Sequence, residues 1–111
     1  MLYTKEQRET FRLLFPKAVF LPGDRVALYD DMYVVTQGIT FHKEISYTIS
    51  DEIARSFTGS SEHIVKLHLE NGTLVDWWLS EHYLKLDHPK NLVIVEGEFV
   101  GYKQIKHSRG V

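Results

Sequence analysis

Cysteine is absent from this chain of 111 residues. Its absence excludes a disulfide framework, a thiol nucleophile and any cysteine-ligated zinc or iron–sulfur site. Long apolar runs are absent too, and no stretch approaches the ~18 residues that a membrane helix needs. Residues 1–6 do not resemble the start of a signal peptide. The sequence therefore predicts a cytoplasmic protein that makes no contact with a membrane.

Cofactor motifs and a strong charge of either sign are also missing. The glycines are too widely spread for a Gly-x-Gly-x-x-Gly or phosphate-binding loop, and we expect no cofactor. The net charge of -2 argues against a dedicated nucleic-acid binder. The middle of the chain is acidic, and the end is basic through Lys103, Lys106 and Arg109. This distribution would suit a basic protein partner, but an ordinary solvated surface with a basic tail is the preferred explanation.

The composition is that of one globular domain spanning residues 1–111, with 43% apolar and 25% charged residues. A short helix is expected first, because Thr4 and Gln7 have the spacing of a capping box and Pro16 would end the helix. The apolar face of this helix is expected to consist of Phe11, Leu14 and Phe15.

Short strands dominate the rest of the pattern. Residues 25–29 and 32–36 read as a hairpin across Asp30-Asp31, and residues 39–49 alternate with a period of two. Ser50 is interpreted as the cap of a short helix that ends near Gly59. The sequence therefore predicts a mainly β or α+β domain.

The dipeptide Asn71-Gly72 is the strongest local signal. It lies between residues 64–69 and 74–79 and predicts a type I′ hairpin. That turn would set Leu69 opposite Leu74 and Val65 opposite Trp78. Trp78 would then lie in the core, and Trp77 would lie on the outer face beside Lys66. A strand over residues 83–86 and a hairpin of residues 92–95 and 99–105 around Glu96-Gly97 are expected to follow.

Several of these features together resemble the SH3-like small β-barrels, with KOW and Tudor-type modules as the nearest comparison. They are Gly23-Asp24-Arg25-Val26 opening a strand, the Asn-Gly hairpin, and a bend leading into Tyr83-Leu84-Lys85-Leu86. The resemblance covers residues 22–87 and leaves a helix in residues 1–16 and a hairpin in residues 89–105 as additions. It implies a partly open barrel that binds peptides, modified side chains or nucleic acid without catalysis.

Aromatic residues make up 13% of the chain and supply the candidate binding site. Tyr29, Tyr33 and Trp77 are predicted to form an exposed aromatic patch, with Lys66 beside Trp77, because tyrosine and tryptophan concentrate at binding hot spots. The alternative is that the terminal helix and the last hairpin cover these faces.

The sequence supports a catalytic or metal-binding site less well than it supports the aromatic patch. His82 and His88 lie beside Glu81 and Asp87, but no recognised ligand spacing supports a zinc site. His63 and His68 are five residues apart, so on one strand they would point to opposite faces. We interpret the histidines as scattered surface residues and expect no metal ion.

A hydrolytic triad can be drawn from Ser60 or Ser61, His63 and a nearby carboxylate. The chain lacks the Gly-x-Ser-x-Gly elbow that would support one. We therefore expect a non-enzymatic, protein-binding or regulatory module, of a kind that would suit a bacterial or phage accessory protein. The alternatives are a nucleic-acid-associated module and a small metal-dependent or hydrolytic enzyme.

Overall fold

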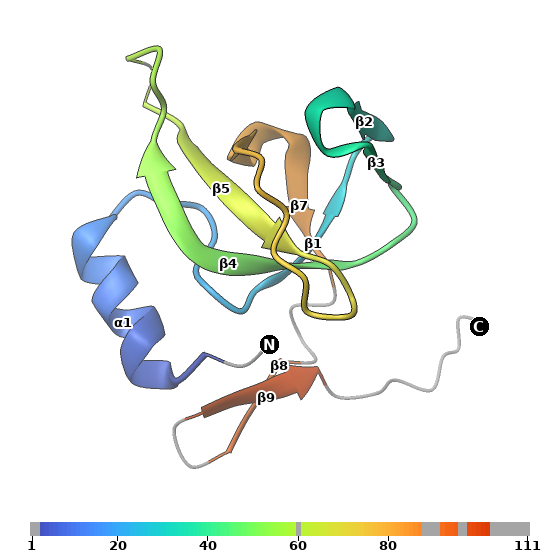
Figure 1. Cartoon of the computed structure of the whole chain (residues 1–111). Helices are drawn as coiled ribbons and strands as arrows, with labels where there is room; N and C mark the ends of the chain where they lie inside the picture. Colours follow the sequence, from blue (N-terminus) through green and yellow to red (C-terminus); the bar gives the residue numbers. More distant parts are fainter. Residues whose placement is uncertain (1–2, 60, 88–91, 96–97, 103–111) are drawn as a thin grey trace.

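The computed structural model describes residues 3–59, 61–87, 92–95 and 98–102 (Figure 1). They form a mainly β structure with one short α-helix and antiparallel sheets, in agreement with the predicted class. No helix in these ranges has the length and hydrophobicity needed to span a bilayer. In chain order the elements are α1 (Lys5–Leu14), β1 (Arg25–Leu28), β2 (Met32–Val34), η1 (Val35–Gln37), β3 (Ile39–Phe41), β4 (Tyr47–Arg55), β5 (His63–His68), β6 (Leu79–Ser80), η2 (Glu81–Tyr83), β7 (Leu84–Leu86), β8 (Leu92–Val95) and β9 (Glu98–Tyr102), where η marks a 3-10 turn.

Helix α1 begins with the predicted capping box. The Thr4 hydroxyl accepts a hydrogen bond from the Gln7 N–H at 3.0 Å, and the Gln7 side chain accepts one from the Thr4 N–H at 2.8 Å. Phe11 and Phe15 pack against the core, as expected. Leu14 does not, because the helix meets the core along the Phe11–Phe15 line and leaves Leu14 at the solvent-facing margin.

The main sheet has five strands in the order β6-β5-β4-β1-β7 (Figure 1). The central strand β4 pairs with β5 and β1, and β1 pairs on its other side with β7. The two edge strands, β6 and β7, are joined through the 3-10 turn η2. No pairing between β6 and β7 is present among the described residues, so the sheet is open there.

The predicted hairpin across Asp30-Asp31 is wrong. Strand β2 pairs with β3 in a separate two-stranded sheet, with Met32 opposite Phe41, while β1 pairs with β4 and β7. The Asp31 carboxylate accepts a hydrogen bond from the Lys43 N–H at 2.8 Å. This contact ties the start of β2 to the loop after β3 and so supports the pairing of β2 with β3.

The predicted helix after Ser50 is also wrong, because β4 continues as a strand to Arg55. The Ser50 hydroxyl does accept a hydrogen bond from the Glu52 N–H, at 3.0 Å. This local bond is of the kind that an N-cap makes, but here it lies at a register shift between Ile49 and Ile53. The shift is a β-bulge, and Figure 1 shows β4 bending along its length.

The core lies between the curved five-stranded sheet, the β2–β3 hairpin and the aromatic face of α1. The rings of Phe41 and Tyr47 meet edge to face, with centroids 5.1 Å apart. The buried core residues are Phe20, Val26, Leu28, Val34, Phe41, Tyr47, Ile49, Ile53, Val65, Leu67, Val75, Leu79 and Leu84.

The Asn-Gly turn is present, but its type and register differ from the prediction. The Gly72 N–H donates to the Leu69 carbonyl at 2.9 Å, so Glu70 and Asn71 occupy the central positions of the turn. The Leu69 N–H bonds to the Thr73 carbonyl at 2.9 Å, which makes a loop of three residues in place of the expected two. The extra loop residue moves the opposing chain by one position.

The changed register reverses the roles of two neighbouring residues. Val75 hydrogen-bonds to Leu67 through its N–H and is buried, whereas Leu74 is 37% exposed. Farther along, Val65 faces Leu79 instead of Trp78. Trp78 is therefore half-buried and is not the core residue that the type I′ register predicts.

Gly72→Val is expected to lower the free energy of unfolding by about 1–3 kcal/mol. Gly72 has φ of +89°, and no atom lies within 4 Å of the position that a Cβ would occupy, so the cost is backbone strain without a clash. Urea denaturation would measure it. Gly72→Asn is the matched control and should cost less, because asparagine tolerates positive φ better than valine. Equal losses in the two variants would contradict this explanation.

The later strands follow the prediction where the structure describes them. Strand β7 covers most of residues 83–86, and β8 pairs with β9 as a hairpin. The predicted turn Glu96-Gly97 and residues 103–105 lie outside the described residues.

Candidate functional site

Tyr29 and Tyr83 form an exposed aromatic pair at the end of the β1–β7 ladder. The Tyr29 N–H donates to the Tyr83 carbonyl at 3.1 Å, which extends the ladder by one position. The two side chains therefore share one face of the sheet and are 58% and 54% exposed. Lys85 places its Nζ 5.3 Å from the centroid of the Tyr29 ring. We call Tyr29, Tyr83 and Lys85 the tyrosine patch.

Tyr33, the second predicted tyrosine, is exposed on β2. Its neighbours Met32 and Val34 pack into or against the core, so strand alternation turns Tyr33 outward. Tyr33 pairs across the hairpin with Thr40. The structure thus places Tyr33 in the β2–β3 sheet, whereas Tyr29 directly follows β1 of the five-stranded sheet.

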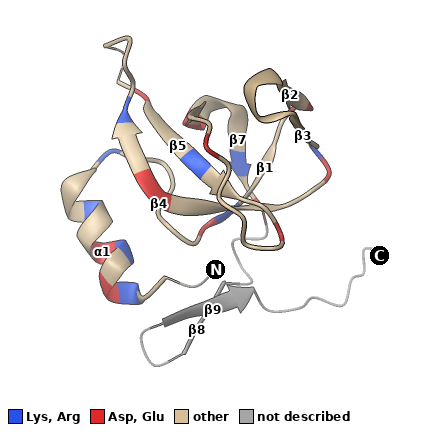
Figure 2. Ribbon diagram, viewed as in Figure 1, with Lys and Arg blue, Asp and Glu red and all other residues tan. Residues whose placement is uncertain are grey.

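Lys66 contacts Trp78 and not Trp77, contrary to the predicted register. Its Nζ lies 4.9 Å from the Trp78 ring, 2.7 Å from the Asp76 carboxylate and 3.0 Å from the Glu52 carboxylate. Figure 2 shows the acidic part of β4 beside the basic part of β5. The hydrogen bonds to Asp76 and then Glu52 raise the pKa of Lys66 above its ordinary value. The charge of Lys66 is therefore paired within the protein.

Trp77 is 38% exposed and lies just before the edge strand β6 in the chain. The neighbouring Trp78 ring meets the ring of Phe57 edge to face, with centroids 6.3 Å apart. Phe57 lies in the loop between β4 and β5 and is strongly exposed. The aromatic neighbour that the structure gives to this pair of tryptophans is thus on Trp78, and it is Phe57, a residue that the sequence pattern places in a helix.

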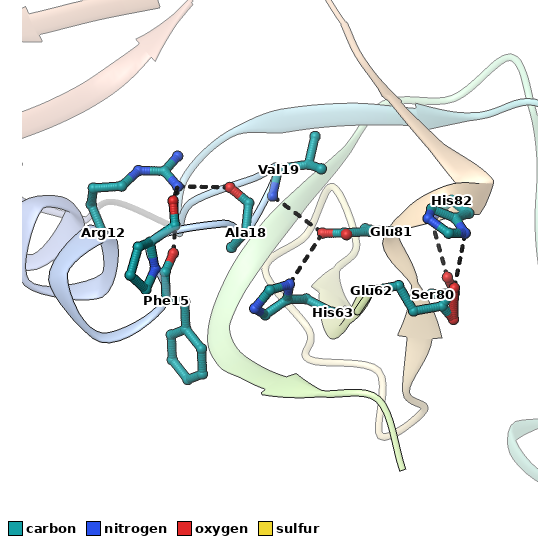
Figure 3. A network of polar contacts seen from close by, with 10 residues as sticks. Arg12, Phe15, Ala18, Val19, Glu62, His63, Ser80, Glu81 and His82 are labelled. Atoms are coloured by element: carbon teal, nitrogen blue, oxygen red, sulfur yellow. Dashed lines mark hydrogen bonds and ion pairs between the residues drawn. The ribbon is translucent and has the colours of Figure 1, made fainter. Parts of the chain in front are cut away.

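A buried histidine and a buried glutamate face each other beneath the loop after α1 (Figure 3). His63 Nδ1 lies 3.8 Å from a Glu81 carboxylate oxygen, too far for a hydrogen bond. The same oxygen accepts a hydrogen bond from the Val19 N–H at 3.2 Å. The Phe15 ring stands perpendicular to the imidazole, with centroids 5.8 Å apart. These contacts hold the His63 ring between α1 and η2.

His63 also lines a pocket of about 270 Å³. The pocket lies between the loop after α1 and the end of the β4–β5 hairpin at which the connecting loop joins the two strands. The serine and histidine of the hypothetical triad therefore meet in one pocket, although Ser60 lies outside the described residues. The described lining residues are Pro16, Lys17, Arg55, Ser61 and His63.

The interpretation of His63 and His68 as surface residues is wrong, because both side chains are buried. The Tyr3 hydroxyl lies 2.8 Å from His68 Nε2, and the Gly72 carbonyl lies 3.1 Å from His68 Nδ1. Burial, followed by the charge of Asp51, raises the pKa of Tyr3 to about 12. The Tyr3–His68 pair therefore joins the chain before α1 to β5.

The other histidines give no metal centre within the described residues. His82 Nδ1 lies 2.8 Å from a Glu62 carboxylate oxygen at the surface, and His88 lies outside the described ranges. No group of three or more histidine, aspartate or glutamate side chains converges there in a way that would hold a metal ion.

In comparisons with known proteins, no family model, no curated protein and no solved structure matches this chain. Sequence reasoning missed Tyr83, Lys85 and Arg55 as surface features. That Tyr83 and Lys85 lie beside Tyr29 can be inferred only when the pairing of β1 with β7 is known. That Arg55 lies opposite His63 can be inferred only when β4 is known to be a strand.

Proposed function

We propose that this chain is a small, non-catalytic protein-binding module with an SH3-like, partly open barrel, and that it binds its partner through the tyrosine patch. The strand order supports the barrel, because edge strands β6 and β7 are joined through a single 3-10 turn. The β2–β3 hairpin is inserted in the chain between β1 and β4, two strands that pair with each other in the main sheet.

The observation that carries the proposed function is the exposed Tyr29–Tyr83 pair. Two exposed tyrosines whose backbones are hydrogen-bonded offer stiff aromatic contact area that loses little conformational entropy on binding. The backbone hydrogen bond between them, next to the paired strands β1 and β7, holds them ready for a partner without rearrangement.

Lys85 indicates the chemistry of the partner. Its ammonium group lies over the Tyr29 ring and makes no ion pair with any residue that the structure describes. A partner segment that covers the two rings with apolar side chains and brings a carboxylate to Lys85 would match the patch. Lys66 is less suited to this role because Asp76 and Glu52 already pair its charge.

The double variant Tyr29→Ser/Tyr83→Ser is expected to lose a stoichiometric partner that the unchanged protein retains after nuclease treatment. The measurement is affinity purification from the native host, with circular dichroism to show that each variant is folded. The matched control is Leu13→Ser/Val35→Ser, which removes two strongly exposed apolar side chains elsewhere. We expect the tyrosine variant to lose about 2 kcal/mol or more of binding free energy, as is typical of a hot spot. This loss corresponds to roughly 30-fold weaker affinity.

Two outcomes would overturn this proposal. Equal capture by the tyrosine variant and the unchanged protein would exclude the tyrosine patch as the binding site. An association that disappears with nuclease would favour the nucleic-acid-associated module instead.

A further inference from the structure

The pocket beside His63 joins basic and hydroxyl groups from two distant segments. Arg55 and His63 are opposite each other in the β4–β5 ladder, so their side chains lie on one face. Ser61 precedes His63 by two residues, and Lys17 comes from the loop after α1. The tyrosine patch contributes none of these lining residues, so the pocket is a separate feature of the chain.

The charged residues that line the pocket, Lys17 and Arg55, are basic, while the buried Glu81 carboxylate lies behind His63, 3.8 Å from its Nδ1. None of the described lining residues is acidic. Lys17 and Arg55 make no ion pair with any described residue. Figure 2 shows the basic end of β4 next to the basic part of the loop after α1. Two cations that face one concavity without counter-ions attract an anion.

The wall that carries Lys17 is fixed by Arg12. Its guanidinium donates hydrogen bonds to the carbonyls of Pro16 at 3.0 Å and Ala18 at 2.8 Å (Figure 3). On the other side, the Val19 N–H is held by the Glu81 carboxylate. The loop backbone is thus anchored on both sides of Lys17, so the pocket is formed before any ligand arrives.

His63 is the lining residue whose side chain is most deeply buried. Its side chain is only 6% exposed, and Nδ1 has no hydrogen-bond partner among the described residues. Figure 3 shows Nδ1 turned toward Glu81 and the other ring nitrogen turned away from it. Because Nδ1 faces Glu81, a ligand in the pocket would bond to the other ring nitrogen of His63.

We infer that this pocket binds a phosphoryl group, either as free phosphate or as a small phosphate monoester. The Arg55 guanidinium matches two phosphoryl oxygens in fork geometry, and Lys17 supplies a second positive charge. The Ser61 hydroxyl adds a donor to the lining, and a phosphoryl group offers these donors more acceptor oxygens than a carboxylate does. The volume of about 270 Å³ restricts the rest of the ligand to metabolite size.

The test is a nuclear magnetic resonance titration of the full chain with inorganic phosphate, glycerol phosphate and acetate at constant ionic strength. The His63 ring and Arg55 side-chain signals are the readout. Both phosphoryl probes are expected to give saturable shifts at these signals, and acetate is not. Tighter binding of glycerol phosphate would identify a monoester as the ligand, and tighter binding of inorganic phosphate would identify the free ion.

Lys17→Gln/Arg55→Gln is expected to weaken phosphate binding by about tenfold or more, because two charged hydrogen-bond donors are lost. Lys5→Gln/Lys43→Gln is the control with the same change in net charge, and it should bind like the unchanged protein. Backbone amide spectra would show that both variants are folded. Shifts that do not saturate, equal weakening in the two variants, or preferential binding of acetate would each overturn the inference.

Discussion

Phe41→Ala is expected to lower the free energy of unfolding by about 3–5 kcal/mol, a large share of the total stability of a small domain. Phe41 is the largest fully buried side chain in the described ranges, and its ring packs edge to face on Tyr47. It lies on β3, outside the five-stranded sheet, so its ring attaches the β2–β3 hairpin to the core. Alanine would leave a cavity where these two sheets meet.

Denaturation in urea, followed by tryptophan fluorescence, would measure this loss. Tyr33→Ala, on the partner strand β2, is the matched control because its ring is exposed; it should change stability by less than about 0.5 kcal/mol. A small loss for Phe41→Ala would mean that the β2–β3 hairpin contributes little to the core.

Val75→Asn is expected to destabilise the protein by about 3 kcal/mol, through a lost apolar contact and a buried amide without assured partners. Val75 is 4% exposed and lies next to Leu67. Leu74→Asn, one residue away and 37% exposed, should cost less than half as much. The comparison measures which of two adjacent residues faces the core.

The same pair of variants tests the turn. With a three-residue loop, Val75 is the sensitive position. A two-residue turn centred on Asn71-Gly72 would make Leu74 the sensitive position. A larger loss for Leu74→Asn than for Val75→Asn would therefore contradict the observed register.

Features decided within a few residues can be predicted from the sequence. Thr4 and Gln7 satisfy each other across three residues, and the helix that they begin is present. The positive φ of Gly72 likewise follows from the dipeptide. The loop length around Gly72 does not, because it depends on how the opposing strand packs on the core.

A sequence signal misleads when the local hydrogen bond behind it occurs in both helices and strands. A serine hydroxyl that accepts from the N–H two residues ahead occurs at helix caps and also at irregularities within strands. Ser50 makes this bond in the bulge of β4. Only the long pairing of β4 with β5 decides between the two, and pairing partners are not evident from a single sequence.

The candidate sites show the same limit. Tyr29 is exposed, which is one of the two alternatives that its sequence context leaves open. Its neighbour Tyr83 escapes prediction because the β1–β7 pairing brings together residues far apart in the chain. The pocket beside His63 escapes it for the same reason, since Lys17 and Arg55 meet only after α1 and the β4–β5 hairpin have packed.

The position of β1 also has a consequence for synthesis of the chain. Strand β1 pairs with β4 on one side and with β7 on the other, and β7 follows it by more than half the described sequence. The β4–β5 hairpin can form as soon as its two strands emerge, because they are adjacent in sequence. The outer edge of β1 stays unpaired until residues 84–86 have been translated. During that interval the nascent chain presents a free strand edge, the kind of surface on which other chains can pair.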